Sequence, residues 1–297
     1  MTMAMAAATQ TTDYSAVAPI AVFDSGLGGL TVVRALQQRL PAEKLVYFGD
    51  TARLPYGTKS PRTVLQFARQ CLRFLMQINP KLLVVACNTV SATALESLRA
   101  EFSIPIIGVL APGATAAVRV TRAVQANGRC MIGLIATEAT IASNAYSLAV
   151  ARLDGDIHLV GRACPLLVPL VEEGRSPDSA IVQAVLADYL EPIRSLQPPA
   201  LILGCTHYPI FARAIQRIMG EATTLIDSAD QTALVVSRRL ATMHLLHPGG
   251  DDGGLTCYVT DQGLRFESLA GRFLGRPIAP PVGVAPEMLE SAPVERP

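Results

Sequence analysis

Two cysteines of this chain occupy positions where a thiol can do chemistry. Each follows a short apolar run that predicts a buried parallel strand: residues 82–86 precede Cys87, and residues 201–204 precede Cys205. A polar turn and then a helical pattern follow each of them. Ligands of open α/β sheets bind beyond the carboxyl ends of the strands, and a helix N-terminus favours a thiolate. We therefore interpret the two thiols as a functional pair.

Hydrogen-bonding side chains stand next to both thiols. They are an amide and a hydroxyl after the first, and a hydroxyl and an imidazole after the second: Asn88, Thr89, Thr206 and His207. His207 could hydrogen-bond backbone in a turn, tune the thiol beside it or hold a proton. Asp50, at the end of another predicted strand, could cap a helix, bind a ligand or tune Cys87. Glu172 lies in a Glu-Glu-Gly sequence, which also fits a solvated helix end.

The glycine-rich stretch 24–29 follows a third predicted strand. It fails the dinucleotide-binding fingerprint, because the position of its last glycine holds Thr31. Its glycines free backbone N–H groups at a helix N-terminus, which suit a carboxylate as well as a phosphate. Asp24 would repel an anion, so we expect it to meet an ammonium group. Helix capping by Asp24 or Ser25 is the simpler reading, and it is compatible with ligand binding.

Two chemistries need a pair of thiols and no metal. One is redox chemistry with a resolving cysteine. The other is proton transfer on both faces of one carbon, where one thiolate removes a proton and a thiol on the opposite face delivers one. A pyridoxal enzyme would need a Schiff-base lysine, and none of Lys44, Lys59 and Lys81 lies in these motifs. We therefore expect no cofactor.

Composition excludes several other classes of function. The net charge is +1 and the basic residues are scattered, so we expect neither direct nucleic-acid contact nor membrane binding. No apolar run approaches the roughly 20 residues that span a bilayer. The six cysteines form no Cys-x-x-Cys pair, which argues against structural zinc and favours a reducing cytoplasm. Cys71, Cys130 and Cys257 fit buried apolar positions, and Cys164, before a proline, is ambiguous.

Strand and helix patterns alternate along the chain, which predicts an α/β fold with parallel sheets flanked by helices. Predicted strands cover residues 19–23, 45–48, 82–86, 104–110, 130–136, 157–160, 201–204, 224–226 and 257–259. Helical patterns cover residues 32–40, 63–78, 92–98, 141–150, 179–196, 227–244 and 264–274, with another ending at 219. The length of 297 residues suggests two domains.

Taken together, the motifs resemble the glutamate racemase family, whose members are cofactor-independent and supply D-glutamate for peptidoglycan. The resemblance covers about residues 19–274. Its motifs are Asp24–Gly29, Pro55–Gly57, Cys87–Thr89 and Leu203–Pro209, with Gly108-Val109, Pro112-Gly113, Ser143–Tyr146 and Cys164–Glu172 adding to the match.

The resemblance implies two pseudo-symmetric α/β domains with the active site at their interface. We expect residues 19–112 and 225–280 to form the first domain, residues 113–224 the second, and residues 1–18 and 281–297 disordered tails. By the same resemblance, Cys87 and Cys205 are the acid/base thiols, for the D and L enantiomers respectively. Positions assigned to substrate contact are Asp24, Ser25, Tyr56, Gly57, Asn88, Thr89, Thr137, Thr140, Thr206 and His207. Those assigned to assist the thiols are Asp24, Asp50, Glu172 and His207.

The resemblance also implies glutamate as the substrate, a homodimer, and a cell-wall precursor as a candidate allosteric ligand. Val90 departs from the pattern, where we would expect a small residue such as alanine; it could narrow the pocket. Three alternatives remain: a racemase for aspartate or another acidic substrate, a regulatory protein such as a gyrase inhibitor, and a redox protein with a Cys87–Cys205 disulfide.

Overall fold

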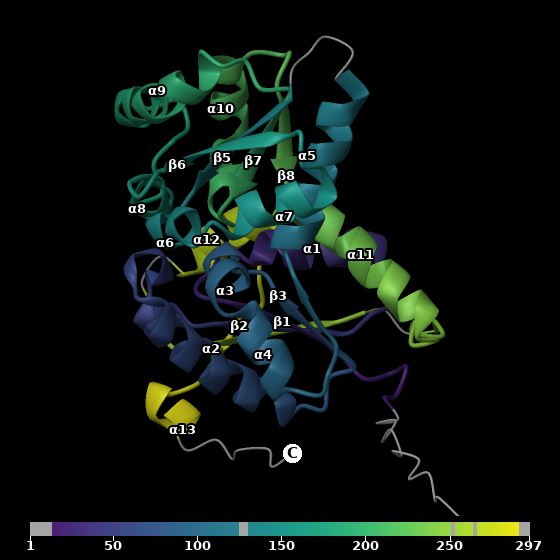
Figure 1. Ribbon diagram of the computed structural model, residues 1–297. Helices are drawn as coiled ribbons and strands as arrows, with labels where there is room; N and C mark the ends of the chain where they lie inside the picture. Colours follow the sequence, from purple (N-terminus) through teal and green to yellow (C-terminus); the bar gives the residue numbers. More distant parts are fainter. Residues whose placement is uncertain (1–13, 125–129, 251–252, 264–265, 291–297) are drawn as a thin grey trace, which may run out of the picture.

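Two parallel sheets form the framework of the molecule. The computed structural model describes residues 14–124, 130–250, 253–263 and 266–290. In this part of the chain a six-stranded sheet has the order β10-β9-β2-β1-β3-β4, and a four-stranded sheet has the order β6-β5-β7-β8 (Figure 1). The first sheet contains β1 (Ile20–Asp24), β2 (Leu45–Gly49), β3 (Leu82–Val85), β4 (Ile106–Gly108), β9 (Leu255–Val259) and β10 (Val282–Gly283). The second contains β5 (Met131–Ala136), β6 (His158–Ala163), β7 (Ala200–Gly204) and β8 (Thr224–Asp227).

The two sheets repeat one topology. In each, four strands stand in the order second, first, third, fourth, and β9 and β10 extend the first sheet beyond β2. Every described strand pair is parallel. Under this order β3 and β7 are equivalent third strands, and β1 and β5 are equivalent first strands. The predicted α/β fold with pseudo-symmetric parallel sheets is confirmed.

Helices cover both sheets. They are α1 (Leu30–Arg39), α2 (Pro61–Met76), α3 (Asn88–Thr93), α4 (Leu95–Glu101), α5 (Leu110–Val124), α6 (Glu138–Ala142), α7 (Ala145–Leu153), α8 (Leu167–Glu172), α9 (Ala180–Arg194), α10 (Ala212–Met219), α11 (Ser228–Thr242), α12 (Phe266–Leu274) and α13 (Pro286–Glu290). The short 3₁₀ turns are η1 (Thr51–Arg53), η2 (Tyr56–Thr58) and η4 (Tyr208–Phe211). None of the helices in the described ranges is long and apolar enough to cross a membrane.

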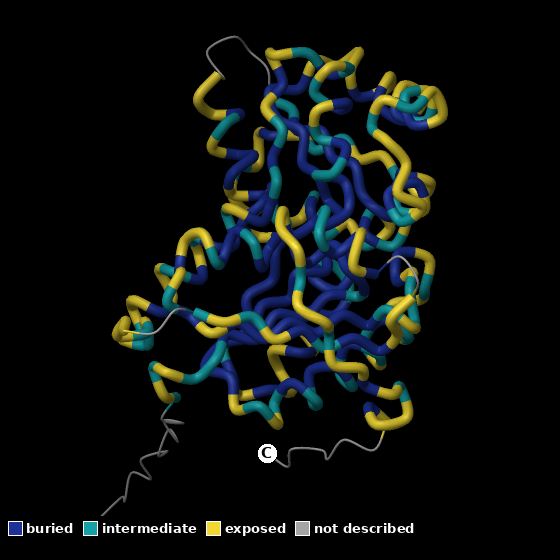
Figure 2. The backbone as a smooth tube through the Cα atoms, turned by 180° about the vertical axis from the view of Figure 1, so that it is seen from behind, coloured by how far each residue is buried: buried dark blue, intermediate teal, exposed yellow. Residues whose placement is uncertain are grey.

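The apolar runs form strands because both faces of these sheets are covered. β1 and β3 are buried along their whole length, as central parallel strands require. One buried cluster continues from the first sheet to the second, through α1, α11 and α12, so the core spans the junction between the sheets (Figure 2). This shared core holds the facing sheet edges in a fixed relation.

Four elements differ from the sequence expectations. Helix α5 begins at Leu110 and includes Pro112, which fits the first turn because the N–H groups there lack intrahelical partners. The helix expected over residues 141–150 is divided into α6 and α7 by Asn144, whose φ of 55° is left-handed. Strand β8 pairs with β7 in the second sheet, although residues 225–227 were expected in the first domain.

The C-terminal segment is the fourth difference. Residues 281–297 were expected to be a disordered tail, but their described part contains β10 and α13. Val284 and Leu289 are buried there and pack in the same cluster as α2, which gives this short, Pro-rich stretch an apolar anchor. Of the expected N-terminal tail, Tyr14 packs against the same cluster. Residues 1–13 and 291–297 lie outside the described residues.

Candidate active site

Both candidate thiols lie just beyond equivalent strands. Cys87 precedes α3 directly after β3, and Cys205 follows β7. The loop after β1 meets the loop after β7 at Gly28, where a Cβ would stand 2.3 Å from the Thr206 Oγ1 and 2.7 Å from the His207 Nδ1. Only glycine allows so close an approach. The carboxyl edges of the two sheets therefore face each other in direct contact.

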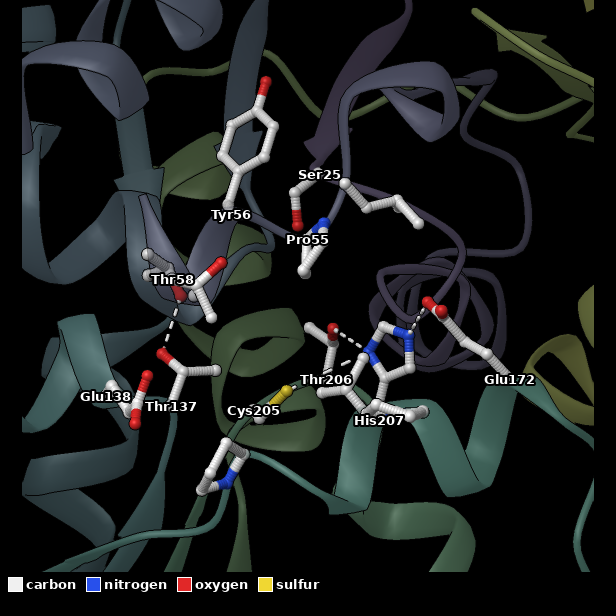
Figure 3. Close-up of a pocket in the computed structure, with 16 residues that line it drawn as sticks. Ser25, Pro55, Tyr56, Thr58, Thr137, Glu138, Glu172, Cys205, Thr206 and His207 are labelled. Atoms are coloured by element: carbon white, nitrogen blue, oxygen red, sulfur yellow. Dashed lines mark hydrogen bonds and ion pairs between the residues drawn. The ribbon is translucent and has the colours of Figure 1, made fainter. Parts of the chain in front are cut away.

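A cavity of about 220 Å³ opens between these edges (Figure 3). One water molecule takes about 30 Å³ of liquid volume, so the space suits a small organic molecule. Its walls come from both sheets and comprise Ser25, Leu54, Pro55, Tyr56, Gly57, Thr58, Thr89, Thr137, Glu138, Pro165, Val168, Pro169, Glu172, Cys205, Thr206 and His207. Cys205 lines it directly, whereas Cys87, 5 % exposed, reaches it through the hydroxyl of Ser25.

Cys205 begins a chain of polar contacts. Its Sγ lies 3.9 Å from the His207 Nδ1, and the His207 Nε2 lies 3.1 Å from the Glu172 Oε1 (Figure 3). Burial alone would lower the pKa of His207, but the contacts with Cys205 and Glu172 outweigh it and raise the pKa to about 10. The imidazole is therefore positively charged at neutral pH, and its Nδ1 places that charge beside the sulfur of Cys205.

Cys87 has the opposite surroundings. Its Sγ donates to the Ser25 Oγ at 3.3 Å. Burial, and then the negative charge of Asp24, raise the pKa of Cys87 to about 12, and charge on Cys205 adds to the shift. The charge states of the two thiols are therefore coupled. Cys87 is a protonated thiol at neutral pH, whereas Cys205 lies beside the imidazolium of His207.

Asp24 is fully buried at the end of β1. Its Oδ2 accepts from the backbone N–H groups of Gly29 at 2.9 Å and Gly26 at 3.3 Å. Its Oδ1 is buried without a hydrogen-bond partner. Burial raises the pKa of this carboxyl, against the opposing attraction of His207. The unpaired oxygen is a ready acceptor for a cationic group of a ligand.

Three threonine hydroxyls from both sheets form a cluster on another wall. The Oγ1 atoms of Thr89 and Thr137 lie 2.9 Å apart, and Thr140 lies 3.0 Å from Thr137. Thr137 also caps α6 by accepting from the Thr140 N–H at 3.3 Å. Gly57 packs closely here, since a Cβ at this position would lie 2.7 Å from the Thr137 Cβ. The cluster offers neutral hydroxyl donors to an anionic group.

Asp50 lies behind the cavity wall. Its carboxylate accepts from the Arg53 Nε at 2.8 Å, from the Thr260 Oγ1 at 3.0 Å, and from the hydroxyl of Tyr56. It is not among the residues that line the cavity. Tyr56 lines the cavity while its hydroxyl points to Asp50. The geometry thus links Asp50 to the position of Tyr56 and joins it to neither thiol.

Several cavity residues had no sequence signal of their own. Leu54 resembles an ordinary core residue, and Pro55, Pro165, Val168 and Pro169 belong to motifs of the resemblance but had no role assigned, because nothing in an apolar pattern distinguishes a cavity wall from a core. Glu138 follows a threonine that the resemblance singled out, and that position was the available clue. Cys71, Cys164 and Cys257 are buried within the apolar clusters. Cys164, which was ambiguous in the sequence, is therefore a buried core residue. In the described ranges, no group of three or more His, Cys, Asp and Glu is arranged to hold a metal ion.

The chain is similar in sequence to a family of known enzymes. The sequence model of the Asp/Glu/hydantoin racemase family matches residues 28–235. A glutamate racemase of Geobacter metallireducens is 46% identical over 256 residues, which are 86% of this chain and 92% of that protein.

Solved structures agree. A Francisella tularensis glutamate racemase in complex with D-glutamate has a TM-score of 0.84 and 37% identity, covering 93% of this chain and 99% of that one. The Escherichia coli glutamate racemase, in complex with L-glutamate and the activator UDP-MurNAc-ala, has a TM-score of 0.69 and 28% identity, covering 86% and 95%.

Proposed function

This chain belongs to the Asp/Glu/hydantoin racemase family, and from that membership we propose that it interconverts L- and D-glutamate without a cofactor, supplying D-glutamate for peptidoglycan. The observation that carries the proposal is the pair of thiols after the equivalent strands β3 and β7, at facing sheet edges. Inversion of an α-carbon needs a base on one face and an acid on the other. Two equivalent thiols meet that requirement, and the identity to glutamate racemases supports glutamate over aspartate.

The charges on the two sides suggest the direction in which the resting enzyme is poised. The thiolate of Cys205, stabilised by the imidazolium of His207, takes the α-proton of L-glutamate. The C–H electron pair stays on the substrate as a planar carbanion, and the thiol of Cys87 delivers its proton to the opposite face. D-glutamate results, with Cys205 now a thiol and Cys87 a thiolate. Proton exchange with solvent restores the starting state, and the reverse reaction exchanges the two roles.

The polar groups of the cavity support the substrate in this scheme. The unpaired Oδ1 of Asp24 accepts from the ammonium group. The hydroxyls of the threonine cluster, and the side chain of Asn88 beside the first thiol, bind the carboxylates. Fixed donors around the α-carboxylate stabilise the negative charge that develops there as the proton leaves. Because the α-proton of an amino acid is very weakly acidic, orientation in a dry site must supply much of the remaining rate enhancement.

A direct assay tests the proposal. The purified protein is incubated with L-glutamate and no added cofactor, and the enantiomers are separated on a chiral column. D-glutamate should accumulate until the two enantiomers are equal. Absence of D-glutamate would contradict the proposal, and faster racemisation of L-aspartate would move the activity to that substrate. A supercoiling assay with the Cys87→Ser protein separates the gyrase-inhibitor alternative from catalysis.

The proposal also covers the regulation of the enzyme, its oligomeric state and its division into domains. Since the Escherichia coli relative holds UDP-MurNAc-ala as an activator, we propose that a UDP-linked cell-wall precursor alters the rate of this enzyme as well. Racemisation measured with and without that compound tests this, and unchanged kinetics would exclude it. We also propose a homodimer, which light scattering on the purified protein would test, and two domains built on the two sheets. The cytoplasmic location stays a prediction.

A further inference from the structure

The chain passes between the two sheets at two places that lie side by side. It leaves the first sheet between β4 and α5, and returns from the second between β8 and α11. A Cβ on Gly113, in α5, would lie 2.4 Å from the Oγ of Ser228, the first residue of α11. The hydroxyl oxygen of Tyr146, in α7, would lie 3.7 Å from that same Cβ position on Gly113. Tyr146 is 1 % exposed, so its hydroxyl is buried at the junction of both crossings.

This hydroxyl makes one strong contact with the active site. It donates to the Asn88 Oδ1 at 2.6 Å, and Asn88 is the residue directly after Cys87. Burial raises the pKa of Tyr146, against an opposing contact with Ser228, so the phenol stays protonated and remains a donor. The bond crosses from α7, which packs on the second sheet, to the first residue of α3, which follows β3 of the first sheet, and both partners are buried.

The contact determines which way the amide points. An asparagine side chain has one oxygen acceptor and one NH₂ group with two donors. With the oxygen occupied by Tyr146, the NH₂ group faces the other way. In the part of the chain that the structure describes, the Asn88 Nδ2 donates no hydrogen bond, and Asn88 keeps 4 % of its surface accessible. Asn88 itself is not among the residues that line the cavity, but it lies between Cys87 and the cavity residue Thr89, and its donors have no partner among the described residues that would compete with a ligand there.

We propose that Tyr146 is a positioning residue of the reaction: its hydroxyl fixes the Asn88 amide with both N–H donors toward the substrate carboxylate, and it ties that amide to the junction where the chain crosses between the sheets. This rests on the proposed racemase function. Without the hydroxyl, the amide can rotate and present its oxygen to the carboxylate, which repels it. Tyr146 touches no substrate and acts through Asn88.

Steady-state kinetics of Tyr146→Phe test this, and Tyr258→Phe, in β9 of the first sheet, is the matched control that loses a tyrosine hydroxyl at another place. The kcat/KM of Tyr146→Phe should fall about tenfold, the scale of one hydrogen bond. It must fall equally in both directions, because the equilibrium constant of racemisation is one. Tyr258→Phe should keep the wild-type kcat/KM. An unchanged kcat/KM in Tyr146→Phe, beside an active wild type, would overturn the assignment, whereas an inactive wild type would instead contradict the proposed function.

A double-mutant cycle separates positioning from a merely structural role. In an Asn88→Ala background, adding Tyr146→Phe should change kcat/KM by less than about twofold, because the group it positions is gone. A full additional tenfold loss would overturn the proposal. Should Tyr146→Phe fail to fold, Asn88→Asp serves instead: it retains an acceptor for Tyr146 but lacks the donors. Its kcat/KM should fall at least tenfold, and wild-type activity would again overturn the proposal.

Discussion

Removing the negative charge of Glu172 should change the pH dependence of racemisation in a defined way. His207 has a pKa of about 10 against an ordinary 6.5, because contacts with Cys205 and Glu172 outweigh its burial. A hydrogen bond to a charged group is worth about 1.5–3 kcal/mol. Glu172 is 31% exposed and its oxygen lies 3.1 Å from the Nε2, so solvent screening places this contact near the lower end. About 1.4 kcal/mol corresponds to one pKa unit, and Glu172→Gln should lower the pKa of His207 by about that much.

The consequence is a pH-dependent loss of activity. At pH 8 the imidazole is mostly protonated in both proteins, so their kcat/KM values should nearly agree. At pH 10 about half of the wild type but only about a tenth of Glu172→Gln keeps the imidazolium, a ratio of about fivefold. The amino group of the substrate titrates in the same range, but it affects both proteins equally and cancels in the ratio.

The assay is kcat/KM for both proteins from pH 6 to 10.5, plotted as a ratio. The control is Glu173→Gln, which removes the next carboxylate along the chain. That group is half exposed and pairs with Arg175 at 2.9 Å, away from His207. The ratio for Glu172→Gln should decline above about pH 8.5, and the ratio for Glu173→Gln should stay flat. A flat ratio for Glu172→Gln, or an equal decline in both variants, would refute the claim that Glu172 acts through His207.

Three further predictions concern two residues of the active site and one buried ion pair outside it. Gly28→Ala inserts a Cβ where the loops of the two sheets meet. Its kcat/KM should fall at least about tenfold, because displacement of a catalytic group by 1 Å can cost about 100-fold. Gly155→Ala, with open space around it, is the kinetic control. Asp24→Asn should raise KM, yet increase the free energy of unfolding at pH 8 by about 1–3 kcal/mol, because it removes a buried charge with an unpaired oxygen. The sign follows from the raised pKa: wild-type Asp24 favours the folded state in its protonated form, so its contribution is lost as pH rises through the folded-state pKa, and the two proteins should converge in stability at low pH. Lys81→Met should lower the free energy of unfolding, measured by urea titration, by about 3–5 kcal/mol. It leaves the carboxylate of Glu43 buried without the Lys81 Nζ, which lies 2.5 Å from the Glu43 Oε2. Adding Glu43→Leu should recover part of this loss.

The sequence was sufficient for the central features of this molecule because they depend on local patterns. Short apolar runs rich in β-branched residues favour covered strands, and a polar residue that ends such a strand lies at the sheet edge where ligands bind. Cys87, Cys205 and Asp24 were found in this way, and their facing arrangement follows from the repeated strand order.

Contacts between distant segments were out of reach. Glu172 and His207 are 35 residues apart, and no pattern along the chain specifies their pairing. Asp50 ends a strand, as a site residue should, but its carboxylate is occupied by Arg53, Tyr56 and a threonine that lies 210 residues away. The short C-terminal elements escaped detection because two buried apolar side chains among prolines produce no periodicity.

The central claim is that two thiols act on opposite faces of one α-carbon, and the position of deuterium tests it most directly. The wild type is supplied with L-glutamate in D₂O, and both enantiomers are analysed by mass spectrometry before equilibrium. The D-glutamate formed should carry an α-deuterium, while the remaining L-glutamate keeps its α-hydrogen, because the proton is delivered by a group other than the one that removed it. Cys87→Ser and Cys205→Ser should each lower racemisation by about 10²–10⁴-fold. D-glutamate that retains the original α-hydrogen, or racemisation that survives in both single variants, would contradict the two-thiol account.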